Sequence, residues 1–289
     1  MNVLGNKIRE ERESKQISQQ DLVKDICREN VLKMIETKNR CDSKIVFHAI
    51  CNRLGLKVDE CIEYTDEEKL SLLLDKIEVK CNIFEHKEAY EIICAYELGE
   101  VQQNILLMSQ YYYYIGITAL VGAKNLSLAL SYLNKGLEYG DNVNIYSILS
   151  VNGLGGVYEE KGDLEEAKIY HEQSLRLVKN YVGNDVSVKY KIYFNSARFY
   201  SEVKEYQRAI EICEEAISLN EEKGTFHHLE ILYYELGFNK HMIGESAVIE
   251  YKMAYYLAKH LKNKHVINVI LDDAKRYNLS FQVDEDGVI

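Results

Sequence analysis

The sequence predicts an all-α protein, in which a small N-terminal domain of short helices precedes an α-solenoid of about five helix pairs. Proline is absent from the 289 residues and glycine occurs only 16 times, and these two residues most disfavour helix interiors. A small residue recurs at Ala89, Ala129, Ala167, Ala209 and Ala247, with spacings of 40, 38, 42 and 38 residues. A period of this length is typical of stacked helical repeats.

Charge is distributed unevenly along the chain. Residues 1–64 contain 12 Lys and Arg against 11 Asp and Glu, a net +1, whereas the remaining residues contain 23 against 35, a net −12, and together these give the overall −11. A near-neutral head on an acidic body suggests two modules with different partners. We therefore expect one domain over residues 1–64 and a second over residues 65–289.

Four short helices are expected in the head. Leu4 and Ile8 set the first helical period, and Ser18 with Asp21 forms a capping box at the start of the second helix. Gly55 suits the left-handed cap that ends the fourth helix. The expected helices cover about residues 4–12, 18–26, 30–36 and 45–54.

The head resembles the Xre/Cro-type helix-turn-helix family over about its first 62 residues. The matching positions are Gly5, Ile8, Arg9, Arg12, Ile17, Ser18, Gln19, Leu22, Ile35, Glu36, Leu54, Gly55 and Leu56. In that family the N-terminus of the third helix enters the major groove of DNA. The positions that the resemblance places on DNA are Arg28, Glu29, Asn30 and Lys33 at base edges, Gln19 at a phosphate or base, and Lys38 and Arg40 at the backbone.

These residue types suit contact with DNA. Arg and Lys bond guanine, Asn bonds adenine, and cations in the following loop neutralise phosphates. The head departs from the usual family pattern at Lys33, Met34 and Asp42. The alternative interpretation is a helix-turn-helix that no longer binds DNA and serves in dimerisation or protein contact.

The body repeats a pattern of small and aromatic residues. Gly155, Tyr158, Gly162 and Ala167 are matched by Ala197, Tyr200, Lys204 and Ala209. This is the tetratricopeptide pattern, stretched from its usual 34 residues, and the small residues let paired helices approach closely. The expected helix pairs cover residues 66–99, 104–139, 144–180, 185–222 and 225–262, followed by a capping helix at 265–278 and a frayed acidic tail at 283–289.

In such arrays the first helix of each pair lines a concave groove. Asn side chains there can pair with the backbone of an extended peptide, Tyr offers an apolar face with a polar tip, and Arg198 could hold a peptide carboxylate. The alternative is that the Asn residues are ordinary solvated positions and the Tyr run at 111–114 is core. The expected groove residues are Tyr111, Tyr114, Asn152, Glu159, Phe194, Asn195, Arg198, Glu202, Tyr233 and Asn239.

No catalytic or metal-binding motif stands out. The eight His and seven Cys residues form no HExxH or CxxC pattern, and GxSxG, GxxxxGK[ST] and GxGxxG are absent. We therefore expect no enzyme activity, no metal and no cofactor.

The scattered cysteines indicate reduced thiols in a cytoplasm. The apolar stretch 105–122 is interrupted by polar residues, so we expect a buried helix and no membrane span.

The whole chain resembles the RRNPP family of regulators from Gram-positive bacteria and their mobile elements, which includes PlcR-like and PrgX-like proteins. The resemblance rests on the domain order and on residues 152–158 and 193–198. In PlcR-like members, Asn residues at these two places clamp the backbone of a short signalling peptide, which implies that role for Asn152 and Asn195. Arg198 matches a basic position.

The resemblance implies a cytoplasmic quorum-sensing transcription regulator without enzyme activity. A homodimer would place two heads on a pseudo-palindromic promoter site in double-stranded DNA, under control of the bound peptide. Two alternatives are a peptide-independent repressor of the phage or mobile-element type, and a scaffold whose head does not bind DNA.

Overall fold

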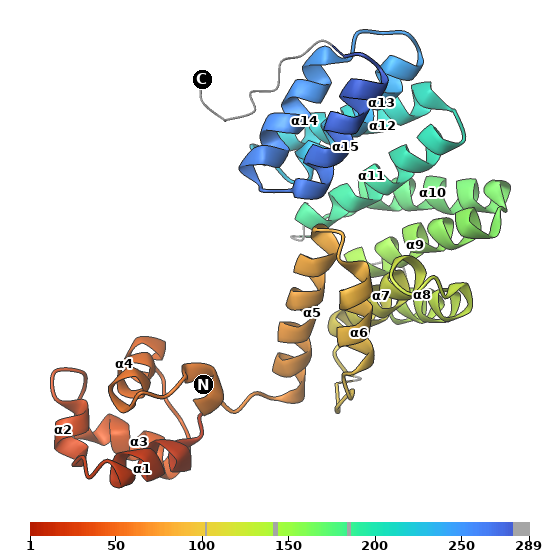
Figure 1. Cartoon of the computed structure of the whole chain (residues 1–289). Helices are drawn as coiled ribbons and strands as arrows, with labels where there is room; N and C mark the ends of the chain where they lie inside the picture. The colour runs from red at the N-terminus through yellow and green to blue at the C-terminus, as the bar shows by residue number, and fades with distance from the viewer. Residues whose placement is uncertain (102, 141–143, 184–185, 280–289) are drawn as a thin grey trace, which may run out of the picture. The chain divides into compact units, whose positions relative to one another are not determined.

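The computed structural model describes residues 1–101, 103–140, 144–183 and 186–279 (Figure 1). Within these residues the chain forms fifteen α-helices and one short 3₁₀ helix, and its β-structure is limited to two isolated bridges. The predicted all-α fold class is confirmed. The chain divides into two compact units, which we call the head unit (Met1–Lys69) and the repeat unit (Leu70–Ile289). The expected frayed tail lies outside the described residues.

The head unit contains four α-helices around one apolar core. Ile8, Leu22, Leu32, Phe47 and Ile50 are completely buried in it. The side chain of Ser18 accepts a hydrogen bond from the backbone of Asp21, and Gly55 adopts the left-handed conformation with φ 71°. The helices are α1 (Gly5–Ser14), α2 (Gln19–Val23), α3 (Glu29–Lys38) and α4 (Lys44–Leu54), followed by the 3₁₀ helix Val58–Cys61.

Two helix ends in the head differ from the prediction. The second helix ends at Val23 rather than near Ile26, because Asp25 takes a left-handed backbone with φ 64° that an α-helix does not accept. The third helix continues to Lys38, so that its last turn occupies part of the expected polar loop, and it stops at the left-handed Asn39.

A buried ion pair links the first three helices of the head. Arg12 on α1 donates from Nε to Glu36 Oε1 at 2.6 Å and from Nη2 to Glu36 Oε2 at 3.1 Å. Arg12 also bonds the carbonyl of Ile17 at 3.2 Å, and the amide nitrogen of Gln19 on α2 bonds Glu36 Oε2 at 2.7 Å. The hydrogen bond with Glu36 raises the pKa of Arg12 despite its burial. Each charged atom is therefore paired, which a buried ion pair requires.

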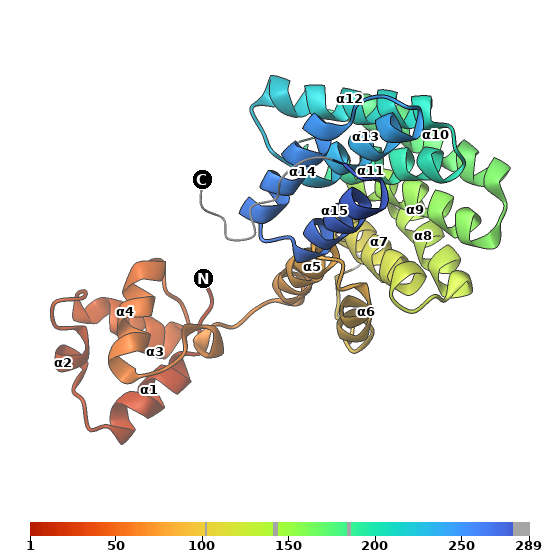
Figure 2. The same ribbon diagram turned by 45° about the horizontal axis from the view of Figure 1, so that its top comes forward.

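The repeat unit consists of five helix pairs and one final helix, stacked in chain order (Figures 1 and 2). The predicted pairs are observed, except that the first ends earlier: α6 stops at Cys94, and the chain turns so that Val101 enters the core. The pairs are α5 (Asp66–Asn82) with α6 (His86–Cys94), α7 (Ile105–Val121) with α8 (Leu126–Gly140), α9 (Ile145–Lys161) with α10 (Leu164–Lys179), α11 (Val186–Glu202) with α12 (Tyr206–Lys223) and α13 (Leu229–Met242) with α14 (Val248–His260), and α15 (Lys264–Arg276) follows.

Small residues set the approach of these helices. The five periodic alanines of the sequence are all buried at or near the start of the second helix of a pair. Glycines act similarly on the first helices: a Cβ on Gly116 of α7 would lie 2.8 Å from Leu133 of α8, and one on Gly153 of α9 would lie 3.0 Å from it. The first helices also contact one another in succession, α7 with α9, α9 with α11, α11 with α13 and α13 with α15. They form the inner layer of the solenoid.

We expect Arg12→Met to destabilise the head unit by about 3 kcal/mol, because the substitution leaves the buried Glu36 carboxylate without its cation. Hydrogen–deuterium exchange of the amides of α1 to α3 in the full chain measures this loss. The control is Arg9→Met, which removes a pair with Glu13 that is exposed to solvent and is therefore expected to leave the exchange rates almost unchanged. Equal exchange in the two variants would contradict the role of the buried pair.

Candidate functional site

The first candidate surface lies at the N-terminus of α3 in the head unit. Arg28 is the residue before the helix and is exposed, as are Asn30 and Lys33. Among the described residues, the side chains of Arg28 and Asn30 have no hydrogen-bond or ion-pair partner in the head, whereas Lys33 lies 3.5 Å from the half-buried Glu29. This surface therefore presents one free guanidinium and one free amide, both of which can bond base edges.

The remaining predicted DNA-contact residues differ in availability. Lys38 and Arg40 are exposed, and Arg40 pairs with Asp42 at 3.0 Å. Gln19 is half-buried, and its amide nitrogen is committed to Glu36 in the buried network. Five of the seven predicted residues are therefore exposed, Glu29 is half-buried beside Lys33, and the amide nitrogen of Gln19 has a structural partner.

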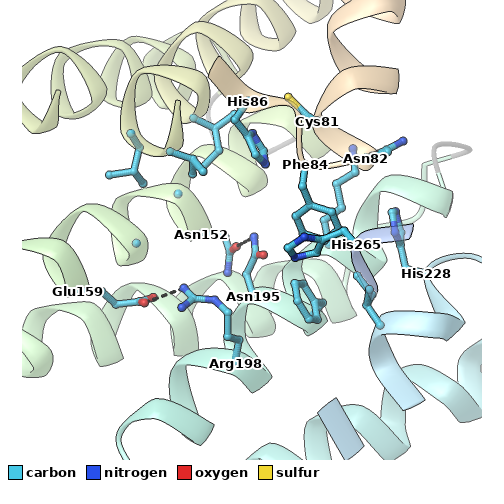
Figure 3. A pocket seen from close by; sticks show the side chains of 18 of the residues that line it. Cys81, Asn82, Phe84, His86, Asn152, Glu159, Asn195, Arg198, His228 and His265 are labelled. Carbon is cyan, nitrogen blue, oxygen red and sulfur yellow. Dashed lines mark hydrogen bonds and ion pairs between the residues drawn. The ribbon is translucent and has the colours of Figure 1, made fainter. Parts of the chain in front are cut away.

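The second candidate site is a pocket of about 520 Å³ inside the repeat unit. Its wall is built from the inner helices α5, α7, α9, α11, α13 and α15, with contributions from α6 and α10. This volume is in the range usual for small-ligand sites, and the wall combines apolar side chains with a few polar ones (Figure 3).

Five of the ten predicted groove residues line this pocket. Asn152 and Glu159 come from α9, and Phe194, Asn195 and Arg198 come from α11. These are the two helices for which the repeat pattern is clearest in the sequence.

The other five predicted groove residues lie outside the pocket lining. Tyr111 and Tyr114 are buried in the core and Asn239 is buried against Glu235, whereas Glu202 is exposed. In α7 and α13 the tyrosines that reach the pocket are Tyr113 and Tyr234, each one position from a predicted residue, Tyr114 or Tyr233. An error of one residue turns a helix by about 100°, which moves a side chain from the groove into the core.

The amide of Asn152 lies at the centre of a buried hydrogen-bond network. Its Nδ2 lies 3.2 Å from His171 Nδ1, 3.0 Å from Ser174 Oγ and 3.1 Å from Ser196 Oγ. Its Oδ1 accepts a hydrogen bond of 2.9 Å from Asn195 Nδ2. Asn152 is only 2% exposed. Its hydrogen-bonding capacity is therefore used within the protein.

Asn195 has polar capacity left over. Its only described hydrogen bond is the one it donates to Asn152, and its side chain is half-buried in the pocket wall. Its second N–H and its carbonyl oxygen therefore remain open to a ligand. Of the two asparagines predicted to bind a peptide, Asn195 is the one placed to make new hydrogen bonds.

Glu159 joins this network to Arg198. His171 Nε2 lies 2.7 Å from Glu159 Oε1, and Arg198 Nη2 lies 2.8 Å from Glu159 Oε2. Burial alone would raise the pKa of Glu159, but the hydrogen bond with His171 and the charge of Arg198 outweigh it and lower that pKa. Arg198 bonds Glu202 as well. The Arg198 charge is thus neutralised by two carboxylates.

Four histidines that line the pocket were not predicted from the sequence. His86 begins α6, His228 precedes α13, His265 lies in the first turn of α15, and His171 lies on α10. Burial, with a smaller effect of Lys191, lowers the pKa of His86 to about 4 and that of His228 to about 3, so both rings are neutral at pH 7. No local motif could have identified them, because they come from four separate elements.

Neither a metal centre nor a membrane helix was found in the part of the chain that the structure describes. No three His, Cys, Asp or Glu side chains there are grouped so as to hold a metal ion. None of the described helices has the length and apolar character needed to cross a membrane.

Comparisons with known proteins agree with this architecture. The family model for the tetratricopeptide repeat matches residues 150–180 and 190–223. No curated protein sequence matches the chain significantly.

Among solved structures, the model is similar to the crystal structure of Bacillus thuringiensis PlcR in complex with the peptide PapR7 and DNA. The TM-score is 0.61 and the identity 18%, over 94% of this chain and 100% of that chain. The apo form of the same PlcR gives 0.56 at 18% identity, over 93% and 98%. ComR of Streptococcus vestibularis in complex with its cognate signalling peptide XIP gives 0.51 at 14% identity, over 96% and 98%. These likenesses show a shared fold of helical head and repeat solenoid.

The two asparagines are expected to differ in their effect on stability. Asn152→Ala should cost about 1–3 kcal/mol, because it removes a buried amide whose two N–H groups are shared among His171 Nδ1, Ser174 Oγ and Ser196 Oγ. Asn195→Ala should cost less than about 1 kcal/mol, because water can replace a half-buried amide. Urea unfolding, followed by tyrosine near-UV circular dichroism, measures the free energy of unfolding of each variant. Tyr64 is the only tyrosine of the head unit, so the signal reports on the repeat unit. Equal losses would contradict the buried network.

The neutral His228 makes stability depend on pH. The folded pKa of about 3 lies below the unfolded value of about 6.5, so the unfolded chain takes up the proton first as pH falls. Stability is therefore lost as pH drops below about 6.5, by about 2 kcal/mol from this residue between pH 7.5 and pH 5. His228→Asn, which tolerates the left-handed backbone at φ 56°, should remove this part of the pH dependence in the same urea assay. An unchanged pH dependence in the variant would show that His228 titrates normally.

Proposed function

We propose that the protein is a transcription regulator that binds double-stranded promoter DNA through its head unit and is controlled by a short linear signalling peptide in the pocket of its repeat unit. One observation carries this proposal: in each unit, side chains that could bind a ligand have polar groups without a described partner in the protein. In the head these are Arg28 and Asn30 at the start of α3. In the repeat unit it is the open amide of Asn195.

The head surface favours DNA over other ligands. Arg28, Lys33, Lys38 and Arg40 place cations at or beside α3 in a chain whose net charge is −11. Cations concentrated in this way can contact phosphates, while Arg28 and Asn30 have the geometry to read guanine and adenine. A head of this size reads a half-site, so we infer that a homodimer binds a pseudo-palindromic operator. A regulator of this kind acts in the cytoplasm.

The pocket favours an extended peptide. Asn195 offers both a donor and an acceptor, which matches the alternating groups of a peptide backbone. Phe194, Tyr113 and Tyr234 supply apolar and aromatic surface for side chains. The structures of PlcR with PapR7 and of ComR with XIP, which share the fold, each contain a peptide. A peptide can shift the protein between two states only if it binds one of them better.

We expect the protein to retard a DNA fragment of its own promoter in a mobility-shift assay. Arg28→Ala should cost about 1–3 kcal/mol and relax the preference at one base pair, because a base-edge contact is lost. Lys38→Ala should weaken binding to all sequences alike, because a phosphate contact carries no sequence information.

The control is Lys135→Ala, an exposed lysine of the repeat unit, which should leave DNA binding unchanged. Failure of the purified protein to bind any fragment of that promoter would support the scaffold alternative. Binding that no peptide changes would support a peptide-independent repressor.

A further inference from the structure

Arg198, which the sequence suggested as the partner of a ligand carboxylate, is already paired within the protein. Arg198 is paired with Glu159 and Glu202, and Lys124, which also lines the pocket, lies 3.4 Å from Glu160. Among the residues that the structure describes, the carboxylates lining the pocket are those of Glu159 and Glu160, and both are committed to these pairs. A ligand anion would therefore gain little at Arg198.

The other end of the pocket is rich in basic groups. Four of the eight histidines of the chain line this one pocket. Lys191 of α11 lies close enough to His86 and His228 for its charge to lower their pKa values. The centroid of the Phe84 ring lies 6.5 Å from that of His86 and 4.5 Å from that of His265. Figure 3 shows Glu159 and Arg198 on one side of the Asn152–Asn195 pair, and His265 and His228 on the other. These basic side chains lie in a unit whose overall net charge is strongly negative.

Three helices also begin at this end. His86 is the first residue of α6, His228 is the residue before α13, and His265 is the second residue of α15. The starts of α6 and α13 have no side-chain cap. Helix N-termini carry unsatisfied backbone N–H groups and a partial positive charge, and both favour an anion.

A second observation points to a missing partner. The Nδ1 atom of His86 is buried and has no hydrogen-bond partner in the described structure. A buried polar atom without a partner is costly and needs an explanation. Lys191 is ion-paired with Glu78 at 3.3 Å and lies 3.5 Å from the Tyr114 hydroxyl. An ammonium group has three N–H donors, so Lys191 can still donate to one further acceptor.

We propose that His86, Lys191, His228 and His265 form an anion subsite that holds a carboxylate of the pocket ligand. The neutral imidazoles of His86 and His228 each donate one N–H, and the His265 ring offers a further polar group. Lys191 adds the ammonium N–H that its pair with Glu78 leaves open, and the starts of α6 and α13 add backbone donors. The carboxylate is either the C-terminus of a peptide or an Asp or Glu side chain. This inference rests on the proposed peptide-binding function, because it assigns chemistry to one end of the same pocket.

The test uses the full chain and three random heptapeptide libraries, with retained peptides quantified by ultrafiltration and mass spectrometry. The first library lacks Asp and Glu and has a free C-terminal carboxylate. The second is identical but ends in a carboxamide. The third ends in a carboxamide and contains Asp and Glu. We expect the first or the third library to be retained at least about tenfold better than the second, the size of effect expected for a charge-assisted hydrogen bond.

Two variants and one control locate the effect. Lys191→Met and His86→Asn should each bring the ratio of carboxylate to carboxamide retention close to one. The second variant guards against misfolding of the first, and tyrosine near-UV circular dichroism checks both. The control is Lys135→Met, which changes an exposed lysine of the repeat unit that does not line the pocket and should keep the preference.

The outcomes separate the two proposals. Equal retention of all three libraries would overturn the anion subsite and leave peptide binding intact. No retention of any library would overturn the peptide-binding function, and the subsite with it. A carboxylate preference that survives in both Lys191→Met and His86→Asn would place the anion elsewhere. Retention of the first library alone identifies the peptide C-terminus as the source, and retention of the third alone identifies an acidic side chain.

Discussion

The buried amide of Asn152 is the constraint on which the site depends. A polar group in a protein interior must be hydrogen-bonded. Asn152 on α9 meets this requirement with partners on α10 and α11. These bonds fix how α9, α10 and α11 sit against each other. His171 can approach closely because position 155 is glycine, where a Cβ would lie 2.8 Å from the ring. The placement of Asn195 and Glu159 at the pocket follows from this network.

The pocket itself arises from the closing of the solenoid. Small residues let the inner helices pack closely, and the array turns until its first pair meets its last helix. The rings of Phe84, in the turn between α5 and α6, and His265 on α15 have centroids 4.5 Å apart. Lys191 on α11 reaches Glu78 on α5 at 3.3 Å. Residues almost 190 positions apart in the chain therefore form one wall, which local sequence patterns do not reveal.

Charge has different uses in the two units. The head buries one ion pair, Arg12 with Glu36, and leaves cations such as Arg28 exposed beside α3. The repeat unit differs: it is acidic overall, and four of its seven histidines, with Lys124, Lys191 and Arg198, line the pocket. Burial keeps His86 and His228 neutral there, so the pocket can hold many basic groups without strong mutual repulsion. This arrangement gives an acidic protein two separate places that suit an anion.

The sequence alone determined the fold class and most helix boundaries, because helix periodicity, caps such as Ser18 and Gly55, and the spacing of the alanines are local properties. It also identified Asn152, Glu159, Asn195 and Arg198, which lie in the repeats with the clearest pattern. Only the tertiary structure decided which of these is free to bind, because the partners of Asn152 and Arg198 come from other helices. It also decided the register of α7 and α13, where packing against neighbours turned Tyr113 and Tyr234 to the pocket. The histidine cluster needed the closed solenoid, since its members become neighbours only when distant helix ends meet.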